Sequence, residues 1–219
     1  LSQNNTPYRE SLGADAGHAC GHHLFGAGSV QAAIAIRYWL ERTNTKGTIR
    51  LYGTPAEEGG SGKVYIARDG YFDDVDVVLH WHPDDMNRSH YSSSNGNKSA
   101  RFKFTGISAH AAGAPQNGRS ALDGVEAMNM MVNMMREHMD EEARIHYVIT
   151  KGGLAPNVVP EEAEVYYYVR HPNVEGVKEL FNRVVKTAEG AARGTETQMD
   201  FEVMHGNYPL MPNKALSVV

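Results

Sequence analysis

Residues 163–170 read Ala-Glu-Val-Tyr-Tyr-Tyr-Val-Arg, with Ala163, Val165, Tyr167 and Val169 at every second position. Side chains on a β-strand point alternately to its two faces, so this alternation predicts a strand with one buried face. Similar alternations occur at 101–105, 145–149 and 199–203. The segment therefore belongs to a group of four predicted strands.

Two long amphipathic segments, at about 121–139 and 174–192, separate these strands and have helical spacing of apolar residues. The resulting order, β-α-β-β-α-β, is the split pattern of a ferredoxin-like α+β sandwich. The first helix is rich in methionine, at positions 128, 130, 131, 134, 135 and 139. Core packing is the favoured interpretation, and contact with a dimer partner is the alternative.

The N-terminal part has a different order of predicted helices and strands. Residues 27–42 predict a helix, 48–54 a strand, and 62–69 a short helix closed by Gly70. Residues 75–81 form an almost continuous apolar run, which is typical of a strand covered on both faces. This alternation of helices and strands predicts an α/β domain with a mostly parallel sheet.

Composition excludes several classes of protein. The 219 residues carry a formal net charge of −5 without a clustered basic face, so we expect no nucleic-acid partner. No apolar run approaches the roughly 20 residues that span a bilayer, and the polar N-terminal stretch does not resemble a signal peptide. Cys20 is the single cysteine, and no internal disulfide can form. We therefore expect a cytoplasmic protein that is not bound to a membrane.

The segment 17–23, Gly-His-Ala-Cys-Gly-His-His, contains two kinds of metal-binding side chain. Thiolate and imidazole bind borderline divalent metals, and the glycines allow Cys20 and His22 to turn toward one centre. By itself the segment leaves metal binding and a surface cluster of histidines equally open.

Two further segments follow predicted strands. Glu57 and Glu58 come after the strand at 48–54, and His80 and His82 end the strand at 75–81. Each has an ordinary alternative, a solvated acidic loop or a histidine at a strand end. Active sites gather at the carboxyl ends of strands in α/β sheets. Because these two segments and the segment with Cys20 and His22 all offer metal-binding side chains at strand or loop ends of one predicted sheet, together they predict a metal site.

Several longer strings are similar to the M20 metallopeptidase family, and to its amidohydrolase branch in particular. They are GHACGHH (17–23), TPAEEGGSG (54–62), DVDVVLHWHP (74–83), TGISAHAAGAPQNGRSALDG (105–124) and APNVVPEEAEVYYYVR (155–170). Within that branch, the residues around 81–83 and 166–172 most resemble the aminobenzoyl-glutamate utilisation group.

The resemblance implies a hydrolase with two divalent metal ions, zinc, manganese or cobalt. It implies that Cys20, shared between the metals, is a ligand together with His22, Glu58 and His82. Glu57 is then the general base, and His80 a neighbour of the ligands. Many relatives have Asp or Asn at the position of His23, and His18 is expected to be structural.

For the second domain the resemblance implies substrate-binding roles. His110 is expected to enter the active site of a partner subunit and to stabilise an oxyanion. Asn157 matches a substrate-binding asparagine. Arg170 suits a substrate carboxylate because of its fork of donors, and a surface salt bridge is its alternative role.

These roles imply cleavage of the amide bond of an N-acyl amino acid or an aminobenzoyl-glutamate-like substrate. The expected organisation is an incomplete catalytic metal-binding domain at 1–95, an inserted lid or dimerisation domain at 96–205, and a return to the catalytic domain at 206–219. We expect a fragment that lacks one C-terminal ligand and is weak or inactive alone, in a homodimer or with a related subunit. A non-catalytic metal-binding or dimerising relative is the alternative, and a hydrolase with Cys20 as nucleophile a third.

Overall fold

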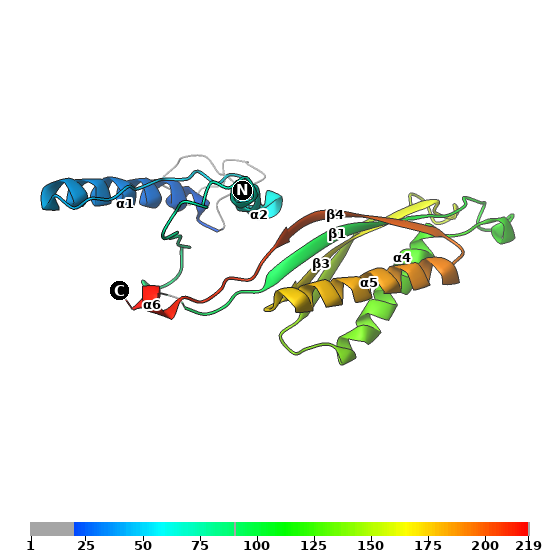
Figure 1. Ribbon diagram of the computed structural model, residues 1–219. Helices are drawn as coiled ribbons and strands as arrows, with labels where there is room; N and C mark the ends of the chain where they lie inside the picture. Colours follow the sequence, from blue (N-terminus) through cyan, green and yellow to red (C-terminus); the bar gives the residue numbers. More distant parts are fainter. Residues whose placement is uncertain (1–19, 90, 219) are drawn as a thin grey trace. The chain divides into compact units, whose positions relative to one another are not determined.

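The computed structural model describes residues 20–89 and 91–218, which divide into two compact units. The first unit contains the described residues up to Glu57 together with Gly62–Arg88. The second contains Glu58–Ser61 and the chain from Ser89 onward. Figure 1 labels their helices and strands, and each unit is described by itself.

The first unit is built around helix α1 (His22–Thr43), which confirms the predicted helix and begins five residues before it. Gly21 precedes the helix in the left-handed conformation, and Asn44 ends it in the same conformation. Helix α3 (Gly62–Arg68) confirms the second predicted helix, and Gly70 follows with φ 79°. The four-residue helix α2 (Glu57–Gly60) lies at the division between the units.

The predicted strands at 48–54 and 75–81 are wrong for this structure. Neither segment forms a strand in the described part of the chain, and their apolar side chains stay in solvent. Leu51 is 52% exposed, Val78 54% and Leu79 77%. An apolar segment becomes a strand only when a neighbouring backbone pairs with it, and here no ladder partner is present among the described residues. The described residues of this unit therefore do not form the predicted parallel sheet.

The second unit confirms the predicted order β-α-β-β-α-β. Its main elements are β1 (Gly96–Thr105), α4 (Ala121–Met135), β2 (Arg144–Lys151), β3 (Glu162–His171), α5 (Val174–Gly194) and β4 (Gln198–Asn207). Short helical turns are η1 (Pro115–Asn117), η2 (Arg136–His138) and α6 (Lys214–Ser217). The sheet order is β2-β3-β1-β4 and each pair is antiparallel, as in a ferredoxin-like sandwich.

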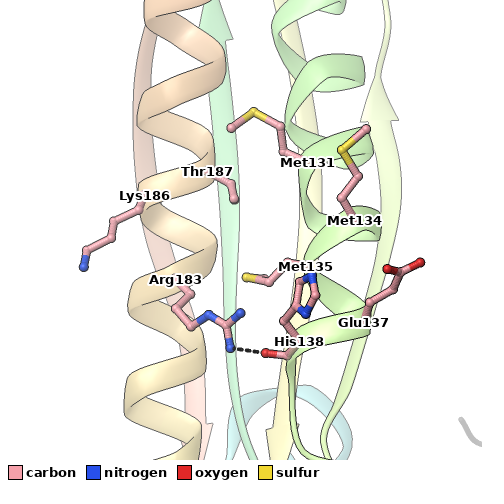
Figure 2. Close-up of a pocket in the computed structure, with 8 residues that line it drawn as sticks. All are labelled: Met131, Met134, Met135, Glu137, His138, Arg183, Lys186 and Thr187. Carbon is pink, nitrogen blue, oxygen red and sulfur yellow. Dashed lines mark hydrogen bonds between the residues drawn. The ribbon is translucent and has the colours of Figure 1, made fainter.

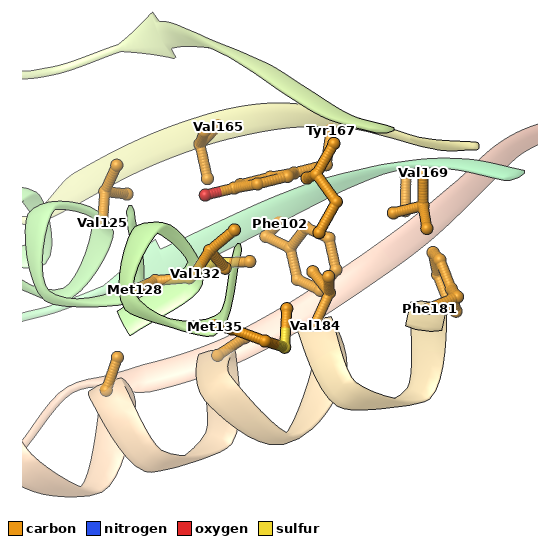
Figure 3. Packing of buried hydrophobic residues seen from close by; sticks show 14 of the residues in the cluster. Phe102, Val125, Met128, Val132, Met135, Val165, Tyr167, Val169, Phe181 and Val184 are labelled. Carbon is orange, nitrogen blue, oxygen red and sulfur yellow. The ribbon is translucent and has the colours of Figure 1, made fainter. Parts of the chain in front are cut away.

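Helices α4 and α5 lie on one face of this sheet (Figure 1), and the core fills the space between them. Figure 3 shows Phe102, Val165 and Tyr167 of the sheet pointing toward the helices. These three side chains are fully buried. The face of the sheet away from α4 and α5 carries the polar residues Arg101, Glu164 and Arg170.

The methionines of α4 divide between the core and the surface. Met128 is fully buried, which confirms core packing for that residue. Met130 and Met134 are 62% and 63% exposed. Met134 also lines an open groove between α4 and α5 (Figure 2), where the Arg183 guanidinium donates to the His138 carbonyl at 2.8 Å. Contact of this helix with a partner remains a prediction.

One buried polar pair gives a direct test of the core. The Tyr167 hydroxyl donates to the Asn129 side-chain oxygen, and Asn129 is only 6% exposed. Tyr167→Phe should lower the free energy of unfolding by about 1–3 kcal/mol, because it leaves a buried acceptor unpaired. Chemical denaturation measures this. The control is Tyr147→Phe, on a half-exposed ring, which should change stability by less than about 0.5 kcal/mol. Equal losses of stability in the two variants would contradict a stabilising hydrogen bond between Tyr167 and Asn129.

Candidate metal centre and substrate-binding residues

Three predicted metal ligands come together in the first unit. Cys20, His22 and His82 each offer a ligand atom, and these atoms lie within 4.8 Å of one another. Cys20 Sγ is 3.2 Å from His82 Nε2, although the two residues are 62 positions apart in the sequence. Gly21, with φ 69°, makes the turn between the first two ligands, and His22 begins helix α1.

The ring of His82 is oriented as in many metal-binding histidines. Its Nδ1 lies 2.8 Å from the Pro83 carbonyl oxygen, to which it donates a hydrogen bond. This contact leaves the lone pair of Nε2 directed toward Cys20. Phe25 packs edge-on against both imidazoles, with ring centroids 5.0 Å from His22 and 5.5 Å from His82. Helix α1 therefore supplies one candidate ligand, His22, and also the Phe25 ring that packs against the imidazoles of both His22 and His82.

The donor set fits a borderline divalent cation. A tetrahedral ion with bonds of about 2.0–2.3 Å holds its ligand atoms roughly 3.3–3.7 Å apart. The Cys20–His82 distance is close to this range, and one thiol with two imidazoles suits zinc. Cys20 and His22 are only half-buried, so a cation could enter from solvent.

Glu57 lies beside this group of residues. Its carboxylate oxygen is 3.5 Å from His22 Nε2, and its side chain is 46% exposed. Such a carboxylate can pair with a ligand or accept a proton from water near it. Glu58 follows in the same short helix α2 but belongs to the second unit, so its role as a ligand remains a prediction.

Three other histidines, His80, His23 and His18, lie near these residues in the sequence. His80 is exposed and does not belong to the group of Cys20, His22 and His82, so its role as a neighbour of the ligands stays a prediction. His23 is an exposed residue in the first turn of α1. His18 lies outside the described residues, so its expected structural role is untested.

In the second unit, His110 and Asn157 lie together. The Asn157 carbonyl accepts the Ala111 amide at 3.0 Å, and His110 forms a bridge with Val158. Nδ1 of His110 accepts the backbone amides of Ala112 at 3.2 Å and Gly113 at 3.0 Å. The proton of the neutral ring therefore sits on Nε2. His110 is exposed and can donate from this atom, as an oxyanion donor must.

Arg170 lies at the other end of the sheet. Strand β3 begins at Glu162, beside the loops of His110 and Asn157, and Arg170 is eight residues further along. At 3.3 Å per residue, these ends are about 26 Å apart. One copy of the domain therefore cannot place Arg170 and Asn157 on the same small substrate.

Sequence reasoning missed two polar residues near Arg170. Asn97 is directly opposite Arg170 in the sheet and is 8% exposed. His205 interacts with Arg170 from strand β4, and burial first, then this guanidinium, lowers its pKa. In the sequence analysis His205 was only the last residue of the expected lid domain at 96–205. Only the strand register reveals this group, because the three residues are far apart along the chain.

Comparison with known proteins agrees with this fold. Residues 92–196 match the sequence model of the peptidase dimerisation domain (M20_dimer). The chain is 46% identical over 91% of its length to one of the subunits of p-aminobenzoyl-glutamate hydrolase from Escherichia coli K12, and covers 42% of that protein. It is 34% identical over 91% of its length to Xaa-Arg dipeptidase of Mus musculus, covering 47%.

A solved structure supports the fold. A putative aminohydrolase from methicillin-resistant Staphylococcus aureus matches 71% of this chain and 44% of its own, with a TM-score of 0.60 and 15% identity. Residues 92–196 therefore match the peptidase dimerisation domain in sequence. The chain belongs to the M20 family, and it spans less than half of the curated relatives named above.

None of the helices that the structure describes is long and apolar enough to cross a membrane.

Proposed function

We propose that this chain is part of a two-metal amidohydrolase that cleaves an N-acyl amino acid or an aminobenzoyl-glutamate-like amide. The observation that carries the proposal is the convergence of Cys20, His22 and His82, with the Glu57 carboxylate beside them. The name of the Escherichia coli relative supports the substrate class.

Bound divalent ions, zinc, manganese or cobalt, would polarise the substrate carbonyl and lower the pKa of a water molecule. Cys20, His22, Glu58 and His82 would hold them. The Glu57 carboxylate takes a proton from the attacking water and delivers it to the departing amine. His110 donates its Nε2 hydrogen to the oxyanion that develops on the substrate carbonyl.

The separation of Arg170 from His110 and Asn157 supports an assembly of two subunits. In this proposal Arg170 binds the substrate carboxylate in one subunit, and His110 and Asn157 reach the substrate from a second copy or a related subunit. The match to a dimerisation domain supports this arrangement. The domain limits at 96–205, with a return at 206–219, are part of the same proposal, as is a cytoplasmic location.

A second candidate is a hydrolase that uses Cys20 as its nucleophile. The 3.2 Å contact between Cys20 Sγ and His82 Nε2 favours it, because a thiol needs a paired base. Its activity would survive chelation, whereas the metal mechanism would not. A relative that binds metal without catalysis would show metal binding and no turnover.

Metal titration tests the proposed centre directly. We expect the 219-residue chain to bind Zn²⁺, and Cys20→Ser or His82→Gln to weaken binding at least tenfold, because each removes a ligand from a small set. Calorimetric titration after removal of metal measures this. The matched control is His80→Gln, which should retain the affinity of the parent chain. Unchanged affinity in the Cys20 and His82 variants would contradict the proposal.

A further inference from the structure

Two arginines on the open face of the sheet have contrasting surroundings. The Arg101 guanidinium lies 4.9 Å from the Tyr166 ring and donates to Glu164 at 2.6 Å. The Arg170 guanidinium lies 5.4 Å from the Tyr168 ring. Its Nε is buried and has no hydrogen-bond partner among the described residues. Arg101 is therefore satisfied by its own fold, and Arg170 is not.

Two further polar atoms without partners lie next to Arg170. The side-chain oxygen of Asn97 is buried and unpaired within the described chain, as is Nδ1 of His205. Asn97 pairs in register with Arg170, so their side chains leave the sheet on the same face. His205 pairs with Ser99, two positions further along β1, and thus shares this face.

Tyr168, which lies between Arg170 and His205, holds the His205 ring in place. His205 Nε2 is 3.1 Å from the Tyr168 hydroxyl, and the two rings pack edge-on with centroids 5.2 Å apart. When the hydroxyl donates to Nε2, the His205 proton is on Nδ1 and is available to an acceptor. Arg170 and His205 then each offer one N–H, and Asn97 offers one oxygen.

A buried polar group without a hydrogen-bond partner is rare in folded proteins because it is costly. Three such groups next to one another therefore indicate a site for a ligand. A carboxylate accepts from Arg170 and His205. An amide N–H on the carbon atom next to that carboxylate donates to the side-chain oxygen of Asn97. An N-acyl amino acid carries these two groups side by side, which is the reason for their match to this set.

We propose that Asn97 and His205, with Arg170, form a pocket that binds the carboxylate and amide N–H of an N-acyl amino acid. The choice of ligand rests on the proposed function, but the pocket does not need the metal. The three atoms are closed to solvent in this structure. The Arg170 side chain is part-exposed, so a change of its rotamer would open the pocket to the ligand.

Three small probes separate the two contacts. They are N-benzoylglycine, its amide N-benzoylglycinamide, and O-benzoylglycolate, in which oxygen replaces the amide nitrogen. With the 219-residue chain in EDTA, N-benzoylglycine should bind about tenfold or more tightly than the uncharged amide. It should bind about two- to tenfold more tightly than the ester, which lacks the N–H. Chemical shifts of the amides of β1 and β4 report the binding.

Three variants assign each contact. Arg170→Gln and His205→Phe should weaken binding of N-benzoylglycine about tenfold. Asn97→Leu should abolish its preference over the ester. Because Asn97→Leu also removes a buried unpaired oxygen, it should raise the midpoint of thermal unfolding. Arg101→Gln is the matched control on the same face and should bind like the parent chain.

Failure of this pocket is separate from failure of the proposed function. Equal binding of the three probes, or equal loss in Arg101→Gln and Arg170→Gln, would overturn the pocket even if the full enzyme hydrolyses amides. Selective binding in EDTA, together with full turnover of the full-length protein after chelation, would retain the pocket and contradict the metal mechanism.

Discussion

Glu57→Gln should leave metal content unchanged and lower the kcat of the full-length protein for an N-acyl amino acid by about 10²–10⁴-fold. Glutamine keeps the shape of the side chain but cannot accept the proton of the attacking water. The Glu57 carboxylate lies 3.5 Å from His22 Nε2, close enough to act on a water molecule at a cation that His22 would hold. Turnover and bound metal are measured on the same preparation.

The control for this variant is Glu41→Gln on helix α1. Glu41 is an exposed carboxylate that pairs with Arg37 at 3.6 Å, and its removal should change neither turnover nor metal content. A Glu57→Gln protein with full metal content and unchanged turnover would remove Glu57 from the mechanism. Loss of metal together with turnover would instead make Glu57 a ligand.

The second unit could be predicted because its signals are local. Each strand has its own alternation, and each long helix has a capping side chain at its start. Ser120 accepts the Asp123 amide at 3.1 Å, and Asn173 accepts the Glu175 amide at 2.8 Å. The order of these elements then leaves few ways to pack two helices on one sheet.

The strands predicted in the first unit depend on partners that no local pattern supplies. Residues 75–81 have the apolar run of a buried strand, yet Leu79 is 77% exposed in this structure. Apolar residues show that a segment favours a buried position. Whether it becomes part of a sheet depends on a neighbouring strand that pairs with its backbone. Helix α1 needs no such partner, since its hydrogen bonds lie within its own segment.

The sequence named Cys20, His22 and His82, which the structure brings together, but it did not predict how they are positioned. The prediction placed His82 at the carboxyl end of a strand, whereas the structure positions it through the Pro83 carbonyl and the Phe25 ring. The sequence pointed to Arg170 but not to its neighbours in the proposed pocket, Asn97 and His205. Asn97 and Arg170 become neighbours only through the register of β1 with β3, which depends on the whole sheet.

Phe102→Ala should lower the free energy of unfolding of the second unit by about 3–5 kcal/mol. Phe102 is fully buried on the central strand β1 (Figure 3), and its ring centroid lies 5.7 Å from Tyr167 and 5.4 Å from Phe201. Removal of the ring leaves a cavity that the sheet and two helices cannot close. Since small domains are stable by about 5–15 kcal/mol, this is a large share.

The matched control is Phe201→Ala, which removes the same ring from the edge strand β4. Phe201 is 37% exposed, so the cost should be about 1–2 kcal/mol. Amide hydrogen exchange in β1 and β3 measures the second unit alone. Both tryptophans, Trp39 and Trp81, lie in the first unit, and their fluorescence reports that unit separately.

These two signals also test whether the units unfold independently. If the units unfold independently, Phe102→Ala should accelerate exchange in the sheet and leave the midpoint of the tryptophan transition unchanged. A parallel shift of both signals would mean that the second unit stabilises the first. The Cys20–His82 contact would then depend on the sandwich, and a mutation in this core would weaken Zn²⁺ binding as well.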